Sequence, residues 1–303
     1  MKIYAVTNSV ISSRDRGKLL DACRNLMFGM FMVGCISGCA SIPQGRYQDF
    51  SEASNTVKSK LADTYVRIEK EERDFNVITA PDKQLSVDSF DPKINGKNYG
   101  IDEQLNKREA LLNVLANYAQ VLESLAGRDY AAGVDKSAQS LAASIRGISG
   151  IDPTLANVFG TVVDGLGKGA TTSMREDALK KVMDKGQAGV EAICNQMQVD
   201  NDKIIKYVNL MRDRYIAHAQ EARPKYGTWD RYKFDLEAAS KLDEFRQIDD
   251  ALVSSSSALK KLPDAHRQIM QSLDNNSVSL DALHEFISEA HDLNNFYRNL
   301  PTK

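Results

Sequence analysis

The four histidines are the side chains best suited to hold a metal ion or transfer a proton near neutral pH. They are His218, His266, His284 and His291. Asp281 and His284 share a helical face, but no second carboxylate–histidine pair accompanies them, and His291 lies two turns beyond His284. We therefore predict solvated histidines on helix faces and no metal site.

A glycine-rich stretch at residues 165–172 has the residue types of a phosphate-binding loop but not the spacing. Lys168 is followed by Gly169 rather than by Ser or Thr, and Val162 stands where the first glycine of such a loop is required. No strand pattern precedes the stretch. We predict no nucleotide site and no cofactor.

Candidates for catalysis are equally sparse. Cys194 lies beside an apolar helical seam, where burial would keep its thiol protonated. Asp249 and Asp250 are consecutive, so they diverge on a helix. The charged runs 69–73 and 212–215 fit solvated helix faces with ion pairs four residues apart. We predict no enzymatic activity.

Aromatic residues gather around one predicted turn between two long helices. Such rings combine a large contact area with a polar group in Tyr and Trp. Two interpretations stay open: rings that close the end of a helical bundle, or a patch that contacts a protein or glycan partner. The six residues are Tyr207, Tyr215, Tyr226, Trp229, Tyr232 and Phe234.

The first 38 residues differ from the rest of the chain. Five basic and two acidic residues precede an uncharged run at residues 26–38. As a helix this run would reach about 20 Å, short of the roughly 30 Å hydrocarbon layer of a bilayer. A basic lead followed by a short apolar run is typical of a secretory signal peptide.

The end of this leader resembles the lipobox of bacterial lipoproteins, with Ile36, Ser37 and Gly38 preceding Cys39. The resemblance covers only the signal. It implies lipidation of Cys39 by acyl chains such as palmitate and cleavage after Gly38. Ala40 and Ser41 follow instead of aspartate, which implies sorting to the outer membrane, facing the periplasm.

Removal of the leader changes the overall charge. The whole chain carries 39 basic and 41 acidic residues, a net charge of −2; without the five basic and two acidic residues of the leader, the net charge is −5. This balance argues against a nucleic-acid partner. Cys194 is then the one thiol left without a lipid, so no internal disulfide can form.

Apolar residues at helical spacing mark most of the remaining chain. Residues 77–100, with two prolines and two glycines, are the long irregular connection, in which 77–79 or 85–90 could form brief strands. Thr228 is a candidate N-cap, Ser254–Ser257 predict a bend, and Pro263 predicts a new helix. The predicted helices span 50–75, 102–125, 129–147, 152–163, 179–222, a helix of about 30 residues that ends at 262, 263–273 and 283–297.

These patterns predict an all-α bundle of six to eight helices, compact or elongated. The expected domains are a signal peptide at 1–38, a lipidated tether at 39–47 and the helical bundle at 48–303. The absence of a catalytic pattern favours a lipid-anchored, non-catalytic binding or scaffold module in the periplasm, with an envelope protein or glycan as partner. The alternatives are a membrane-perturbing protein using residues 131–170 and a helical-bundle enzyme acting on envelope polymers.

Overall fold

The computed structural model describes residues 42–78, 93–94, 97–98, 102–127, 130–164, 166, 172–275 and 277–300. Apart from Ile42, these residues belong to one compact unit, Pro43–Lys303. Within them lie seven α-helices, which confirms the predicted all-α bundle of six to eight helices. The helices are α2 (Gln44–Ile78), α4 (Asp102–Ala126), α5 (Tyr130–Ile148), α6 (Pro153–Asp164), α7 (Thr172–Ala222), α8 (Thr228–Asp274) and α9 (Asp281–Arg298).

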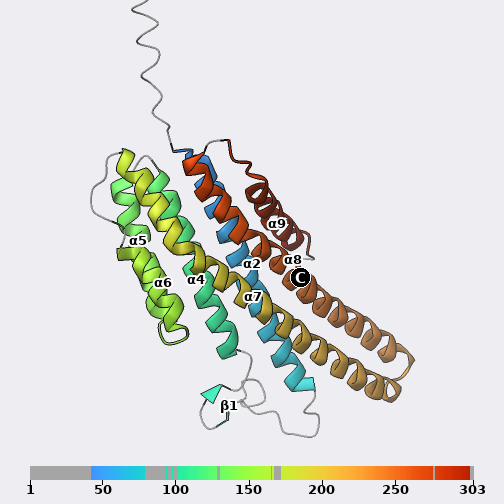
Figure 1. The fold of residues 1–303 in the computed structure, drawn as a ribbon. Coiled ribbons are helices and arrows are strands. Elements are labelled where there is room, and N and C mark those ends of the chain that lie inside the picture. Colours follow the sequence, from blue (N-terminus) through green and yellow to red (C-terminus); the bar gives the residue numbers. More distant parts are fainter. Residues whose placement is uncertain are drawn as a thin grey trace, which may run out of the picture. The chain divides into compact units, whose positions relative to one another are not determined.

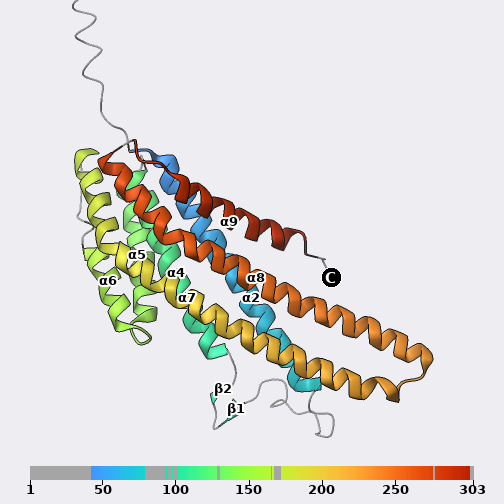
Figure 2. The ribbon, with the colours of Figure 1, turned by 45° about the vertical axis from the view of Figure 1, so that its right-hand side comes forward.

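Four long helices form the centre of this unit. α2, α4, α7 and α8 pack in a ring, each against the next, and neighbours run antiparallel (Figure 1). The hairpin of α5 and α6 lies against α4 and α7, and α9 lies against α2 and α8 (Figure 2). The chain therefore builds an up-and-down bundle and covers two of its sides with the remaining helices α5, α6 and α9.

The apolar helical seam expected beside Cys194 is confirmed on α7. Leu179, Met183, Val190, Ile193 and Met197 are all buried. Apolar residues at spacings of three and four lie on one face of a helix, so they can face the ring interior together. A single helix of 51 residues carries this seam.

Glycines allow α7 to approach its neighbours closely. A Cβ atom at Gly186 would lie 2.4 Å from the hydroxyl of Tyr118 on α4, and one at Gly189 would lie 2.6 Å from the ring of Phe159 on α6. Both rings are fully buried, and their centroids are 5.4 Å apart in an edge-to-face arrangement. The missing side chains on α7 are therefore what makes room for this aromatic pair.

The prediction that Pro263 starts a new helix is wrong. α8 continues without interruption through Ser255 and Pro263. The Ser255 hydroxyl is buried and donates to the carbonyl of Ala251 at 2.5 Å, so its polar group is satisfied within the helix. Leu262 and Ile269 are buried on either side of the proline, and this packing holds the helix together although Pro263 lacks an N–H donor.

Two predicted helix starts need correction, and one is confirmed. α2 begins at Gln44, so residues 44–47 of the expected tether are helical; Tyr47 is fully buried, and its packing extends the helix backwards. Thr228 is the first helical residue of α8, and Gly227 is the N-cap. α6 begins as predicted, with the Asp152 carboxylate accepting a hydrogen bond from the backbone N–H of Leu155 at 2.9 Å.

The irregular connection begins where α2 ends, at Ile78. Within it the structure describes one short antiparallel pair, β1 (Lys93–Ile94) and β2 (Lys97–Asn98). The strand predicted at 77–79 is wrong for Val77 and Ile78, which belong to α2. The strand predicted at 85–90 lies outside the described residues.

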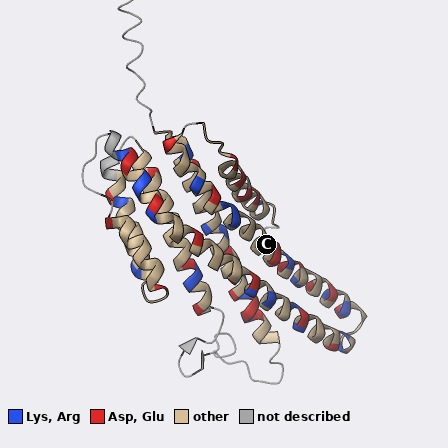
Figure 3. Ribbon diagram, in the orientation of Figure 1, with Lys and Arg blue, Asp and Glu red and all other residues tan. Residues whose placement is uncertain are grey.

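The far ends of α7 and α8 form a separate region of the unit. No residue from 216 to 244 is buried, and we call this segment the hairpin arm. It includes the short 3-10 helix η1 (Arg223–Lys225) that joins the two helices. In both ribbon views the arm extends past the other helices, at the opposite end of the bundle from the start of α2. Basic and acidic residues alternate along it, whereas α6 carries almost none (Figure 3).

Candidate functional site

Four of the six predicted aromatic residues lie together at the end of the hairpin arm. Tyr226 stacks on Phe234 with ring centroids 4.9 Å apart, and Trp229 stacks on Tyr232 at 5.8 Å. Trp229 is 67 % exposed, Tyr232 55 % and Tyr226 41 %. We call these four residues the tip patch. Their exposure differs from that expected of rings that close a bundle end.

The other two residues of the predicted set lie away from the tip patch. Tyr215 is buried, with its ring centroid 6.2 Å from that of Phe245. Tyr207 is half-buried, and its hydroxyl donates to the carboxylate of Glu72 on α2. Both tyrosines lie on α7 before the arm begins, where α2 or α8 supplies a packing partner. The predicted patch is therefore divided between core and surface.

Charged side chains surround the tip patch and pair locally. The Arg223 guanidinium donates to both oxygens of Asp235, at 2.7 and 2.8 Å, and these bonds lower the pKa of Asp235. The Lys233 ammonium lies 5.8 Å from the Trp229 ring centroid, and Leu236 is exposed one turn beyond Tyr232. The region thus offers exposed rings with charged groups at their edges.

A second cluster lies where the arm meets the bundle. The Lys241 ammonium of α8 lies 2.7 Å from Glu71, 2.6 Å from Asp74 and 3.2 Å from Glu244. Lys70 approaches the same three carboxylates, closest to Asp74 at 2.8 Å. We call these five residues the ionic seam, because they join α2 to α8 through charge rather than through apolar contact.

The prediction that residues 69–73 form a solvated face is wrong at Glu71, which is 3 % exposed. Glu71 follows Thr64 and Ile68 on the buried face of α2, at spacings of four and three. That spacing was the available sequence evidence that Glu71 occupies a core position. The position of Lys241, 170 residues later, could not be predicted from it.

The ionic seam keeps its groups charged. Burial alone would raise the pKa of Asp74, but hydrogen bonds from Lys241 and Lys70 outweigh burial and lower it. Burial alone would lower the pKa of Lys241, but hydrogen bonds to Asp74 and Glu71 raise it. Both shifts favour the ionised pair, so the seam is an ion-pair network at neutral pH.

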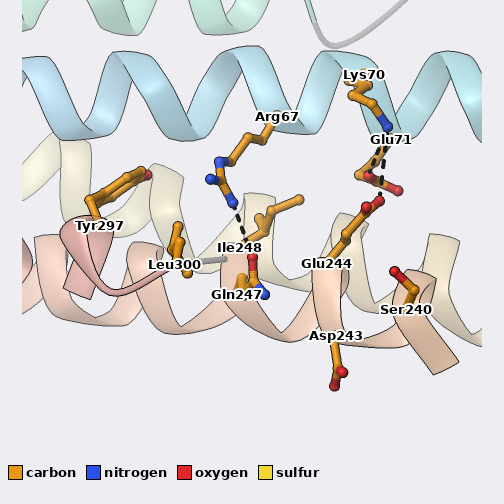
Figure 4. Close-up of a pocket in the computed structure, with 10 residues that line it drawn as sticks. All are labelled: Arg67, Lys70, Glu71, Ser240, Asp243, Glu244, Gln247, Ile248, Tyr297 and Leu300. Atoms are coloured by element: carbon orange, nitrogen blue, oxygen red, sulfur yellow. Dashed lines mark hydrogen bonds and ion pairs between the residues drawn. The ribbon is translucent and has the colours of Figure 1, made fainter. Parts of the chain in front are cut away.

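Beside the ionic seam lies a groove of about 670 Å³ between α2 and α8 (Figure 4). Arg67 of α2 reaches across it, and its guanidinium donates to the Gln247 side chain of α8 at 3.2 Å. The end of α9 closes one side of the groove with Tyr297 and the following Leu300. Sequence reasoning did not find this groove. Its lining residues are Arg67, Lys70, Glu71, Ser240, Asp243, Glu244, Gln247, Ile248, Tyr297 and Leu300.

The prediction of solvated histidines is wrong for His266, which is fully buried in α8. Its Nδ1 lies 2.5 Å from the Gln187 side-chain oxygen, which can only accept, so Nδ1 carries the proton. Its Nε2, 2.7 Å from the Tyr118 hydroxyl, then accepts a hydrogen bond from that hydroxyl. Burial lowers the pKa of His266 to about 3, so the ring is neutral and serves to join α4, α7 and α8.

The remaining histidines and the cysteine agree with expectation. His284 and His291 are exposed, and His218 is half-buried. Cys194 is buried and unpaired, and burial raises the pKa of its thiol. Within the described residues, no three His, Cys, Asp or Glu side chains gather in a way that could hold a metal ion.

The lipidation motif of Ile36, Ser37, Gly38 and Cys39 lies outside the described residues, as does most of the glycine-rich stretch at 165–172. Within residues 131–170, the structure describes most of α5 and all of α6, joined by a short turn. No helix in the described ranges is long and apolar enough to cross a membrane.

The chain was compared with protein-family models, with curated proteins and with solved structures. No family model, no curated protein and no solved structure matches it.

Proposed function

We propose that this chain is a lipid-anchored bacterial envelope protein that binds a partner and catalyses no reaction. The exposed stacking of Trp229 and Tyr232 at the end of the hairpin arm is the observation that carries the binding role. Trp and Tyr are the residues that most often supply binding energy at interfaces, since each buries a large ring at a low cost in conformational entropy. Exposed apolar surface that is rimmed by polar residues often marks an interaction site.

The order of these features along the chain supports membrane attachment at Cys39 and partner binding at the hairpin arm. Four residues lie between Cys39 and Gln44, the first residue of α2, so the two Cα atoms are five residue steps apart. That link, fully extended, reaches at most about 17 Å, so a lipid on Cys39 would hold the start of α2 near a bilayer. The tip patch lies at the opposite end of the bundle from the start of α2. Since α8 alone is about 70 Å long, the patch would be presented well away from that bilayer.

The anchor is tested by metabolic labelling with palmitate in a bacterial host. The wild-type chain is expected to incorporate label, and Cys39→Ala is expected to lose it. Cys35→Ala, which changes a neighbouring cysteine of the leader, is the matched control and keeps the label. Equal labelling of the wild type and Cys39→Ala would refute lipidation at this position.

The binding role is tested by cross-linking in intact cells followed by affinity purification. The double variant Trp229→Ala/Tyr232→Ala is compared with Leu210→Ala/Val253→Ala, which removes two exposed apolar side chains outside the tip patch. We expect cross-linked partners with the wild type and the control pair, and their loss with the tip variant. The same products from both variants, or none from the wild type, would overturn the role of the tip patch.

A further inference from the structure

We propose that the groove between α2 and α8 binds a small organic anion. Arg67 would hold the carboxylate or phosphate head, and Ile248, Tyr297 and Leu300 would contact an apolar tail. This site is separate from the tip patch and does not depend on the proposed partner-binding role. Three properties of the groove support it.

The first property is an unmatched positive charge. Arg67 is half-buried and makes one hydrogen bond, to the neutral Gln247 side chain. Among the described residues, no carboxylate pairs with Arg67. A guanidinium carries five N–H donors in a planar fork that suits carboxylate and phosphate oxygens. Most of these donors are therefore available to an anion in the groove.

The second property is that the other charged groups of the groove already have charged partners. Lys70 and Glu71 belong to the ionic seam, together with Glu244. Asp243 points away from the groove in Figure 4 and accepts a hydrogen bond from Arg246 at 2.9 Å. The seam has two cations and three carboxylates, so it would not attract an anion itself. It leaves the Arg67 end of the groove as the place where an anionic head is stabilised.

The third property is an apolar surface beside that charge. Ile248 forms a buried part of the groove wall, and Tyr297 and Leu300 close one end (Figure 4). The Arg67 guanidinium lies 5.6 Å from the Tyr297 ring centroid, which orients it before a ligand arrives. The volume of about 670 Å³ lies within the range of small-molecule sites, so a charged head and a tail can enter together.

Titration calorimetry with simple amphiphiles tests the proposal on the full chain. Octanoate and octyl phosphate share a tail and differ in the anionic head, octylamine reverses the charge, and inorganic phosphate lacks the tail. We expect binding of at least one of the two anionic amphiphiles, with at least tenfold weaker binding of octylamine and of phosphate. The preferred head identifies a carboxylate or a phosphate ligand.

Variants locate the binding. Arg67→Gln should weaken binding of the preferred anion at least tenfold, because charge-assisted hydrogen bonds are lost. Arg67→Lys keeps the charge without the fork and should bind with intermediate affinity. Arg73→Gln, on an exposed position of the same helix, should bind as the wild type does. No binding of either anion, equal binding of octylamine, or unchanged binding by Arg67→Gln would each overturn the proposal; thermal melting confirms that each variant is folded.

Discussion

The same two helices, α7 and α8, form both the hairpin arm and part of the buried bundle. We call the bundle outside residues 216–244 the base. At the base, α7 and α8 are covered by α2, α4, α6 and α9, and Phe159 and His266 are fully buried there. In the arm no residue from 216 to 244 is buried, and Lys241 pairs with α2 where the arm meets the bundle. The comparison shows that a continuous helix can act as core in one half and as a display surface in the other.

Local stability is therefore expected to decrease along α7 and α8 from the base to the arm. Burial of apolar side chains supplies most of the favourable free energy of folding, so the base carries the stability of the unit. The arm depends on exposed ion pairs such as that of Arg223 with Asp235, and on stacked rings. We expect its amide hydrogens to exchange through local opening, at a lower free energy than those of the base.

Truncation of one phenylalanine in each region tests most directly whether the base and the arm differ in their contribution to stability. Phe159→Ala removes a fully buried ring that packs on Tyr118. It should lower the free energy of unfolding by about 3–5 kcal/mol. Phe234→Ala removes a ring that stacks on Tyr226 at the surface and should cost under about 1 kcal/mol. Urea denaturation measures both. Similar costs for the two variants would contradict the division into base and arm.

The ionic seam lies between the two regions and should be intermediate. Lys241→Met leaves the buried Glu71 with Lys70 as its nearest cation, 3.8 Å away. We expect a loss of about 2–3 kcal/mol, below the value for a fully buried pair because Lys241 is partly exposed. Lys233→Met in the arm is the matched control and should change stability little. A loss in Lys241→Met no greater than in this control would show that the seam does not join α2 to α8.

The buried histidine gives the base a pH dependence of its own. The unfolded chain protonates His266 below about pH 6.5, whereas the folded chain resists protonation down to about pH 3. The unfolded state therefore binds more protons in this window, and stability falls as pH falls. One and a half pH units below pH 6.5 correspond to about 2 kcal/mol.

This prediction is checked by urea denaturation at pH 7 and pH 5. His266→Gln should lose the part of the stability change that belongs to His266. His284→Gln, at an exposed position, should keep it. If both variants retain the wild-type change between the two pH values, the neutral, buried state of His266 is wrong.

The helical fold was predictable because helical spacing is a local property. The seam of α7 from Leu179 to Met197 follows from residue order alone. Pro263 misled the prediction because a local rule about proline was overridden by burial of Leu262 and Ile269 on one face. Tertiary packing on both sides of a proline cannot be predicted from the residue spacing of either helix segment alone.

The buried polar residues were only partly predictable. Glu71 and His266 both occupy positions of an apolar stripe, so their spacing indicates burial. Their partners Lys241 and Tyr118 come from other helices, and pairing between helices is set by the assembled bundle. The groove at Arg67 has the same origin, since α2, α8 and the end of α9 all contribute to it.

The smallest effect is expected in the arm itself and tests its local opening. Asp235→Asn weakens the pairing with Arg223 across the turn, where both side chains are solvated. Because the base carries the stability, the urea midpoint should stay unchanged while the arm opens more often. Limited trypsin digestion would then cut faster at Lys225, Arg231 or Lys233, with sites in the base unaffected. Lys180 forms an equally exposed ion pair with Asp274 at the base, so Asp274→Asn is the control. Equal acceleration of arm cleavage in both variants would mean that opening of the arm does not depend on its own turn.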